Sequence, residues 1–151
     1  MIEVKNLYKS FDGRDVLIDI NATFRDGRTN LIIGQSGSGK TVLMKNLVGL
    51  FIPTSGQILY DGRDFVQMTK QERIAMRREM GMIFQSAALF DSLSVLENVM
   101  FPLDMFSSMT LRERQRRAQE CLDRVNLTDA GAKFPGEISG GMQKRVAIAR
   151  A

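Results

Sequence analysis

The 151-residue sequence predicts an α/β fold, and three observations support that prediction. Apolar and polar residues alternate over residues 1–30, around two Asp-Gly pairs, as they do in antiparallel strands. A short apolar run at residues 31–33 then leads into a glycine-rich loop and a helical segment. Further along the chain, three Ser/Thr-x-x-Glu capping boxes mark helix starts, at Thr69, Ser94 and Thr110.

The first 30 residues are predicted to form an antiparallel β region. Its alternating apolar positions are Ile2, Val4, Val16, Ile18 and Ile20. Asp-Gly pairs at 12–13 and 26–27 are the residues that tight turns between strands favour. Beyond the glycine-rich loop, a Pro-Thr-Ser-Gly turn at 53–56 introduces one more short strand, which ends at Asp61.

Residues 69–127 are predicted to be mainly helical, with a short strand at residues 80–85 and a loop after it. Pro135-Gly136 interrupts the chain before a last helix, which begins at Ser139. The predicted organisation is a single domain of four segments. They are the β region over 1–30, a core over 31–85, a helical subdomain over 86–138 and the start of the last helix over 139–151.

The glycine-rich loop, here called the P-loop, carries the strongest chemical motif. It matches Gly-x-x-x-x-Gly-Lys-[Ser/Thr] and reads Gly34-Gln35-Ser36-Gly37-Ser38-Gly39-Lys40-Thr41. Glycines let backbone N–H groups turn toward phosphate oxygens, and a helix N-terminus adds unpaired donors. Lys40 supplies charge for the β- and γ-phosphates, and the Thr41 hydroxyl can ligate Mg²⁺. The motif predicts a site for a nucleoside triphosphate with Mg²⁺.

A second anion-binding motif is predicted about a hundred residues later. Ser139 is a good helix N-cap, and Gly140 and Gly141 leave backbone donors uncovered at the helix start. Alone, a Ser-Gly-Gly triplet is weak, because it also occurs in ordinary turns. Together with the P-loop, however, the sequence resembles the ABC-type ATPases over essentially its whole length. The triplet corresponds to the family's signature motif, here residues 139–143, which includes Met142 and Gln143.

The resemblance implies further site residues. Phe11 corresponds to the aromatic that stacks on adenine, and Gln85 to the Q-loop glutamine that links the γ-phosphate and Mg²⁺ to a membrane subunit. The signature would contact ATP held by the P-loop of a second copy, in a head-to-tail homodimer. Core packing of Phe11 and a plain exposed strand end at Gln85 are the alternatives.

One departure from the commonest signature bears on the substrate. Ile138 stands in place of Leu, and Met142 in place of Gln, while the Ser-Gly-Gly donors are intact. The Met variant is similar to the ATPases of Mla- and Mce-type lipid-trafficking transporters, as is the stretch at residues 84–90. Lipid transport is therefore the implied function, with an integral membrane permease as partner.

Several family elements are missing from these residues. No Walker B strand with its Mg²⁺-binding Asp, no catalytic Glu after it and no His are found. Asp61 does end an apolar run, but Gly62 follows it, and an Asp-Gly pair indicates a turn. We therefore expect the chain to be an N-terminal piece of a longer ATPase. We also expect it to be inactive in hydrolysis and unstable alone, because the strand at 31–33 would lack its parallel neighbours.

Composition and missing motifs narrow the possible location, partners and nucleotide of the protein. No apolar run approaches the ~20 residues of a membrane span, no signal peptide is visible, and a single Cys suits a reducing compartment. The net charge of +4 is spread over several helices, so nucleic acid is not an expected partner. The expected location is cytoplasmic, peripheral on the inner face of the membrane. A soluble ABC ATPase without a permease is the alternative, and a GTPase is disfavoured because no Asn-Lys-x-Asp motif occurs.

Overall fold

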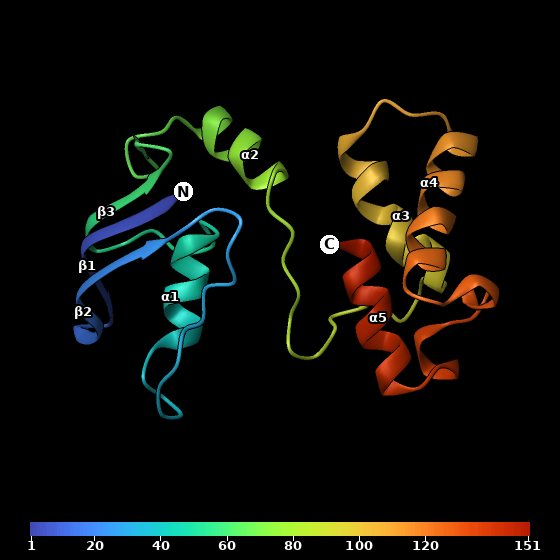
Figure 1. Cartoon of the computed structure of the whole chain (residues 1–151), viewed down its shortest axis with the longest axis horizontal. Helices are drawn as coiled ribbons and strands as arrows, with labels where there is room; N and C mark the ends of the chain where they lie inside the picture. The colour runs from blue at the N-terminus through green and yellow to red at the C-terminus, as the bar shows by residue number, and fades with distance from the viewer. The chain divides into compact units, whose positions relative to one another are not determined.

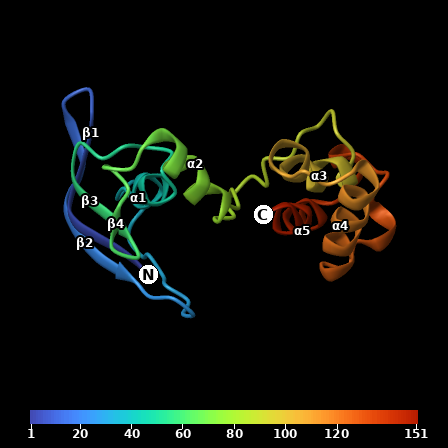
Figure 2. The ribbon, with the colours of Figure 1, turned by 90° about the horizontal axis from the view of Figure 1, so that it is seen from above.

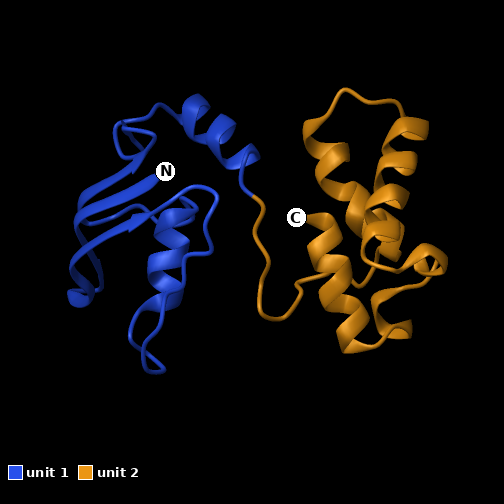
Figure 3. Ribbon diagram, viewed as in Figure 1, with its two compact units in different colours: residues 1–80 blue, residues 81–151 orange.

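The computed structural model describes all 151 residues, which form two compact units, residues 1–80 and residues 81–151 (Figures 1 and 3). Each unit has its own hydrophobic core, so each is described by itself. None of the helices combines the length and the apolar character that a bilayer crossing requires.

The first unit is built on a four-stranded antiparallel sheet. Its strands lie in the order β2-β1-β3-β4. They are β1 (Ile2–Phe11), β2 (Arg14–Phe24), β3 (Ser55–Tyr60) and β4 (Arg63–Asp64). Ile2 pairs with Phe24 on one side and with Tyr60 on the other, so β1 is the central strand. The predicted strand before Asp61 is confirmed, and it joins the sheet begun by the first 30 residues.

Two helices, α1 (Lys40–Leu47) and α2 (Lys70–Arg78), pack against this sheet (Figure 2). Leu43 and Leu47 of α1 and Met76 of α2 belong to the same core as Val4, Leu7, Leu17, Ile58, Tyr60 and Phe65. Burial raises the pKa of the Tyr60 hydroxyl to about 12, because the charged form would lose its hydration.

The alternation predicted for β2 is interrupted by a bulge. Asn6 and Asp19 adopt left-handed backbone conformations, with φ of 47° and 48°, and the register between β1 and β2 shifts nearby. The Asn6 side-chain amide donates to the Asp19 carboxylate at 2.9 Å, which holds the two irregular positions together. Leu17 is buried, Ile18 is 62% exposed and Ile20 packs against the core, so the bulge at Asp19 lies between two inward-facing residues.

Two predicted strands are wrong. Residues 31–33 form no strand, and Leu31 and Ile33 are each 81% exposed. Residues 80–85 form no strand either. A strand requires a neighbour to satisfy its N–H and C=O groups, and none of the four strands pairs with either segment.

The second unit is a bundle of three helices, α3 (Val95–Phe106), α4 (Leu111–Arg124) and α5 (Gly140–Arg150). Short 3-10 turns η1 (Thr128–Ala130) and η2 (Pro135–Glu137) lie between α4 and α5. Each helix contributes a fully buried residue to the core of this unit, namely Val95, Leu122 and Val146.

All three predicted capping boxes are confirmed, at Thr69, Ser94 and Thr110. In each box the cap hydroxyl accepts the backbone N–H three residues later, and the glutamate there accepts the backbone N–H of the cap residue. These hydrogen bonds favour the carboxylate form and lower the pKa of the glutamates, which are Glu72, Glu97 and Glu113.

Candidate functional site

The P-loop joins residues 31–33 to α1, and its glycines are needed for its shape. Gly37 and Gly39 have φ of 80° and 87°, a region that L side chains rarely adopt. A Cβ on Gly39 would also lie 2.9 Å from Leu17 Cδ2 and 3.1 Å from the Val16 carbonyl oxygen. Gly39 is the N-cap of α1, so the close approach to β2 fixes where this helix starts.

Lys40 is the first residue of α1, and its side chain turns back over the loop. Its Nζ donates to the carbonyl oxygens of Gly34 at 2.8 Å and Gln35 at 2.6 Å. The Lys40 ammonium group is therefore held against the P-loop. The last backbone amides of this loop lie at the start of α1. Gly34 to Ser38 and Thr41 are exposed, so loop backbone and hydroxyl groups are open to a ligand.

The metal-binding capacity of the site rests on neutral oxygen atoms. No group of three or more His, Cys, Asp or Glu side chains lies close enough together to hold a metal ion. Thr41 offers a hydroxyl, a ligand type that Mg²⁺ accepts when phosphate oxygens and water complete its octahedron. The donor set therefore fits Mg²⁺ arriving with a triphosphate.

Phe11 lies at the end of β1, in the same unit as the P-loop, and pairs with Arg14 across the β1–β2 turn. Its ring packs edge-on against Phe51, with centroids 5.2 Å apart, and the Lys9 Nζ lies 4.8 Å from its centroid. Phe11 is nevertheless 36% exposed, so part of the ring surface is accessible. Phe51 itself follows α1, since its backbone N–H donates to the Lys45 carbonyl oxygen.

Gln85 lies in the second unit, exposed at a turn that the Ala87 N–H closes by donating to the Phe84 carbonyl oxygen at 3.1 Å. Residues 86–93 follow it and are called here the post-Gln85 loop. Sequence reasoning missed the two side chains that hold this loop, Asn98 of α3 and Arg150 of α5. Asn98 bonds to backbone groups 4 to 8 residues before it, and Arg150 to groups 62 and 63 residues before it, so neither belongs to a short motif of the capping-box kind.

Asn98 is fully buried and satisfies the backbone at the end of the loop. Its Oδ1 accepts the Phe90 N–H at 2.8 Å. Its Nδ2 donates at 3.0 Å to three carbonyl oxygens, those of Phe90, Leu93 and Ser94. At the start of the loop, the Arg150 guanidinium donates to the carbonyl oxygens of Ala87 and Ala88, both at 2.8 Å.

The signature residues open α5, as predicted. The Ser139 hydroxyl accepts the Met142 N–H at 3.3 Å, which makes Ser139 the N-cap. Gly140 and Gly141 are exposed, and the first N–H groups of a helix have no acceptor within the helix. Gln143 turns inward instead, because its side-chain amide donates to the Pro135 carbonyl oxygen at 2.9 Å.

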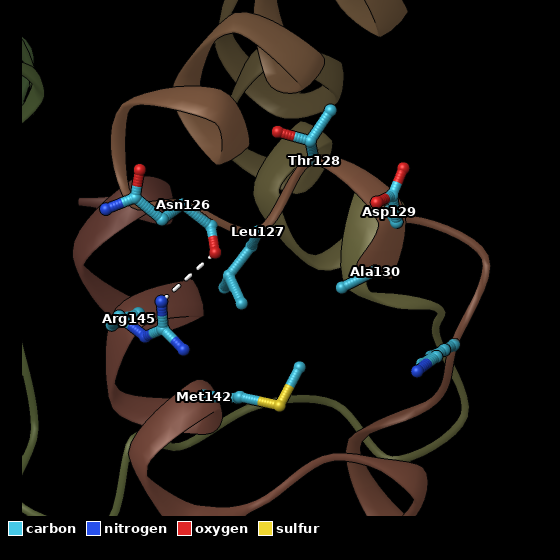
Figure 4. A pocket seen from close by; sticks show the side chains of 8 residues that line it. Asn126, Leu127, Thr128, Asp129, Ala130, Met142 and Arg145 are labelled. Carbon is cyan, nitrogen blue, oxygen red and sulfur yellow. Dashed lines mark hydrogen bonds between the residues drawn. The ribbon is translucent and has the colours of Figure 1, made fainter.

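Met142 points into a pocket of about 330 Å³ (Figure 4). The lining residues are Asn126, Leu127, Thr128, Asp129, Ala130, Lys133, Met142 and Arg145. Arg145 closes one side by donating to the carbonyl oxygens of Val125 at 2.9 Å and Asn126 at 3.1 Å. The thioether of Met142 also packs against the core of the second unit, so this residue helps to seat α5.

The structure thus groups the predicted site residues in two sets. Phe11 and the P-loop belong to the first unit, and Gln85 and the signature belong to the second. In the first unit Phe11 reaches α1 through Phe51, and in the second α5 carries the signature residues and bonds to Ala87 and Ala88, two and three residues after Gln85.

Comparisons with known proteins identify the family of this arrangement. The ABC transporter family model matches residues 17–151. The chain is 40% identical over 150 residues to the probable ribonucleotide transport ATP-binding protein mkl of Mycobacterium leprae, covering 99% of this chain and 43% of that protein. It is 38% identical over 151 residues to the intermembrane phospholipid transport system ATP-binding protein MlaF of Haemophilus influenzae, covering 100% of this chain and 57% of that one.

The relatives are named for different substrates. The methionine import ATP-binding protein MetN of Symbiobacterium thermophilum is 42% identical over 155 residues, covering 100% of this chain and 46% of that protein.

Among solved structures, the dimeric post-hydrolysis state of the ATP-binding cassette MJ0796, bound to ADP and Pi, superposes with a TM-score of 0.88 at 34% identity. That match covers 99% of this chain and 68% of the other. The chain therefore spans about half the length of these curated relatives.

Proposed function

Because the chain belongs to the ABC transporter family, we propose that its P-loop binds Mg-ATP and that the complete ATPase uses ATP hydrolysis to drive a lipid transporter. The observation that carries the proposal is the P-loop itself. Its left-handed glycines, the N-terminus of α1 and the Lys40 ammonium all converge on residues 34–41. Such an arrangement concentrates donors and positive charge where phosphate oxygens would bind.

Each site residue has one role in this proposal. Lys40 neutralises charge on the β- and γ-phosphates, the Thr41 hydroxyl ligates Mg²⁺, and the exposed ring surface of Phe11 stacks on adenine. Gln85 links the γ-phosphate and Mg²⁺ to the membrane permease. The uncovered amides of Gly140 and Gly141 contact the γ-phosphate of ATP bound to a second copy.

The proposed assembly is a head-to-tail homodimer on a membrane permease, at the inner face of the cell membrane. The dimeric state of the solved cassette at 34% identity supports the homodimer. The post-Gln85 loop suits a permease contact, because Phe90 is exposed beside the half-buried Leu89. A lipid substrate is supported by the MlaF relative and by the Ile138 and Met142 form of the signature. No activity is proposed for residues 1–151 alone.

Nucleotide titration tests the binding site. The protein to use is a hybrid that continues residues 1–151 with the remainder of the Haemophilus influenzae relative, titrated with a fluorescent ATP analogue and Mg²⁺. Lys40→Ala should weaken binding by about 10- to 100-fold, since a hydrogen bond to a charged group contributes about 1.5–3 kcal/mol. Lys5→Ala is the matched control, because Lys5 pairs only with Glu3 at 3.0 Å on the surface. Equal affinity in Lys40→Ala and Lys5→Ala would refute the P-loop assignment.

Crosslinking and substrate stimulation test the transporter assignment. Cysteines placed one at a time at residues 86–93 should crosslink to the co-expressed permease, whereas a cysteine at Arg28, at an exposed turn of the first unit, should not. Failure of all loop positions in an assembled complex would favour the soluble alternative. In the reconstituted complex, phospholipid should stimulate ATP hydrolysis, and stimulation by methionine or a ribonucleotide instead would overturn the lipid assignment.

A further inference from the structure

The start of the post-Gln85 loop has a backbone conformation that its own residues do not favour. Ala87 and Ala88 are consecutive residues with φ of 60° and 47°, a left-handed region that is unfavourable for residues with a Cβ. Ala87 is buried, and Ala88 is exposed. Two left-handed alanines in sequence need support from outside the loop.

Arg150 supplies that support from the last turn of α5. Its two terminal nitrogens each donate to one of the two alanine carbonyl oxygens, both at 2.8 Å. A planar guanidinium presents such a pair of donors in fixed geometry, whereas a lysine ammonium acts as a single point charge. The side chain is half-buried, so the two hydrogen bonds are partly shielded from competing water.

The same helix carries the signature glycines at its other end. α5 runs from Gly140 to Arg150, a length of about 16 Å, without a proline or a break. Its middle is anchored in the core by Val146 and Ala147, which are almost fully buried. A shift of the post-Gln85 loop would therefore move Arg150 and, through a stiff helix, the Gly140 and Gly141 amides.

We propose that Arg150 is a positioning residue that couples the post-Gln85 loop to the signature glycines through α5. This inference rests on the proposed function, in which the loop meets the permease and the glycines meet ATP. Arg150 touches neither substrate nor metal. Its role is to make the position of the signature amides depend on the position of the loop.

Arg145 provides a matched control on the same helix. It also donates to two consecutive carbonyl oxygens, those of Val125 and Asn126, at 2.9 and 3.1 Å. Its acceptors lie at the end of α4 and not beside Gln85. Arg145→Ala therefore removes a similar pair of hydrogen bonds from α5 but leaves the loop contact intact.

Amide hydrogen exchange in the hybrid ATPase tests the local claim. Arg150→Ala should raise exchange about tenfold at residues 86–90, and Arg150→Lys should raise it less. Arg145→Ala should raise exchange at residues 125–128 and leave residues 86–90 unchanged. Unchanged exchange at residues 86–90 in Arg150→Ala would overturn the inference, whatever happens to activity.

ATPase measurements with and without the permease test the coupling. In Arg150→Ala the stimulation by the permease should fall about tenfold, while the affinity for the ATP analogue stays within twofold. Arg150→Lys should recover part of the stimulation, and Arg145→Ala should keep all of it. Full stimulation in Arg150→Ala would overturn the inference. Absence of stimulation in the unsubstituted hybrid would refute the proposed function instead, so the two failures are distinguishable.

Discussion

Replacing Asn98 by alanine is expected to be among the most destabilising single changes in the second unit. The side chain is fully buried and takes part in four hydrogen bonds, with Oδ1 accepting one N–H and Nδ2 donating to three carbonyl oxygens. Because Nδ2 has only two protons, we count these as about three full bonds, at about 1 kcal/mol each. Leaving the Phe90 N–H without an acceptor adds about 1 kcal/mol. The expected loss is therefore about 3–4 kcal/mol.

Asn46 is the matched control for this prediction. It is also fully buried, but only its Nδ2 is bonded, to the Val42 carbonyl oxygen at 2.8 Å, and its Oδ1 has no partner. Asn46→Ala removes one hydrogen bond together with one unsatisfied acceptor, so we expect a loss of about 1 kcal/mol or less.

Residue-resolved hydrogen exchange in the hybrid ATPase measures both losses, because it reports the free energy of opening separately in each unit. In Asn98→Ala the Phe90 amide should lose its protection first, followed by the helix α3. Asn98→Asp keeps the acceptor for the Phe90 N–H but places a carboxylate against three carbonyl oxygens, so it should be worse at pH 7 than at pH 4. A loss below about 1 kcal/mol in Asn98→Ala, or a loss no larger than that of Asn46→Ala, would refute the reasoning.

The geometry predicts the effect of three further substitutions on stability. Gly39→Ala should lower stability by about 2–4 kcal/mol in chemical denaturation, because a left-handed φ and the contact with Leu17 both oppose a Cβ; a loss under 1 kcal/mol would contradict this. Ala88→Gly should raise stability by about 0.5–1 kcal/mol, since glycine relieves the left-handed strain, and any clear loss would count against it. Lysines at Leu31 and Ile33 should lower the stability of the hybrid, where we expect the C-terminal part to cover these two exposed side chains; an undisturbed hybrid would contradict that expectation.

Features encoded by neighbouring residues were predictable from the sequence. The capping boxes at Thr69, Ser94 and Thr110 depend on side chains three residues apart, and all three are present as predicted. The N-cap at Ser139 is equally local. The P-loop motif likewise predicted a helix leaving the loop, over residues 42–48, and α1 lies there but begins two residues earlier, at Lys40.

Features that depend on distant partners were not predictable in the same way. Residues 31–33 have the composition of a buried strand, yet β propensity expresses fit to a neighbouring sheet, and no strand of this chain lies beside them. The bulge at Asn6 and Asp19 needs two positions thirteen residues apart to become left-handed together. The sequence contains Asn and Asp at many exposed positions, so their types alone did not indicate a bulge.

In the second unit, the shape of the loops depends on residues outside the predicted site. Its loops are held by helix side chains that satisfy loop backbone groups, namely Asn98, Arg145 and Arg150. Such loops need little from their own side chains, since the bonds run to carbonyl and N–H groups that almost every residue has. Substitutions on the surface of the post-Gln85 loop can therefore change what it contacts while Asn98 and Arg150 preserve its shape. A loop of this kind can vary its partner without losing its connection to the signature helix.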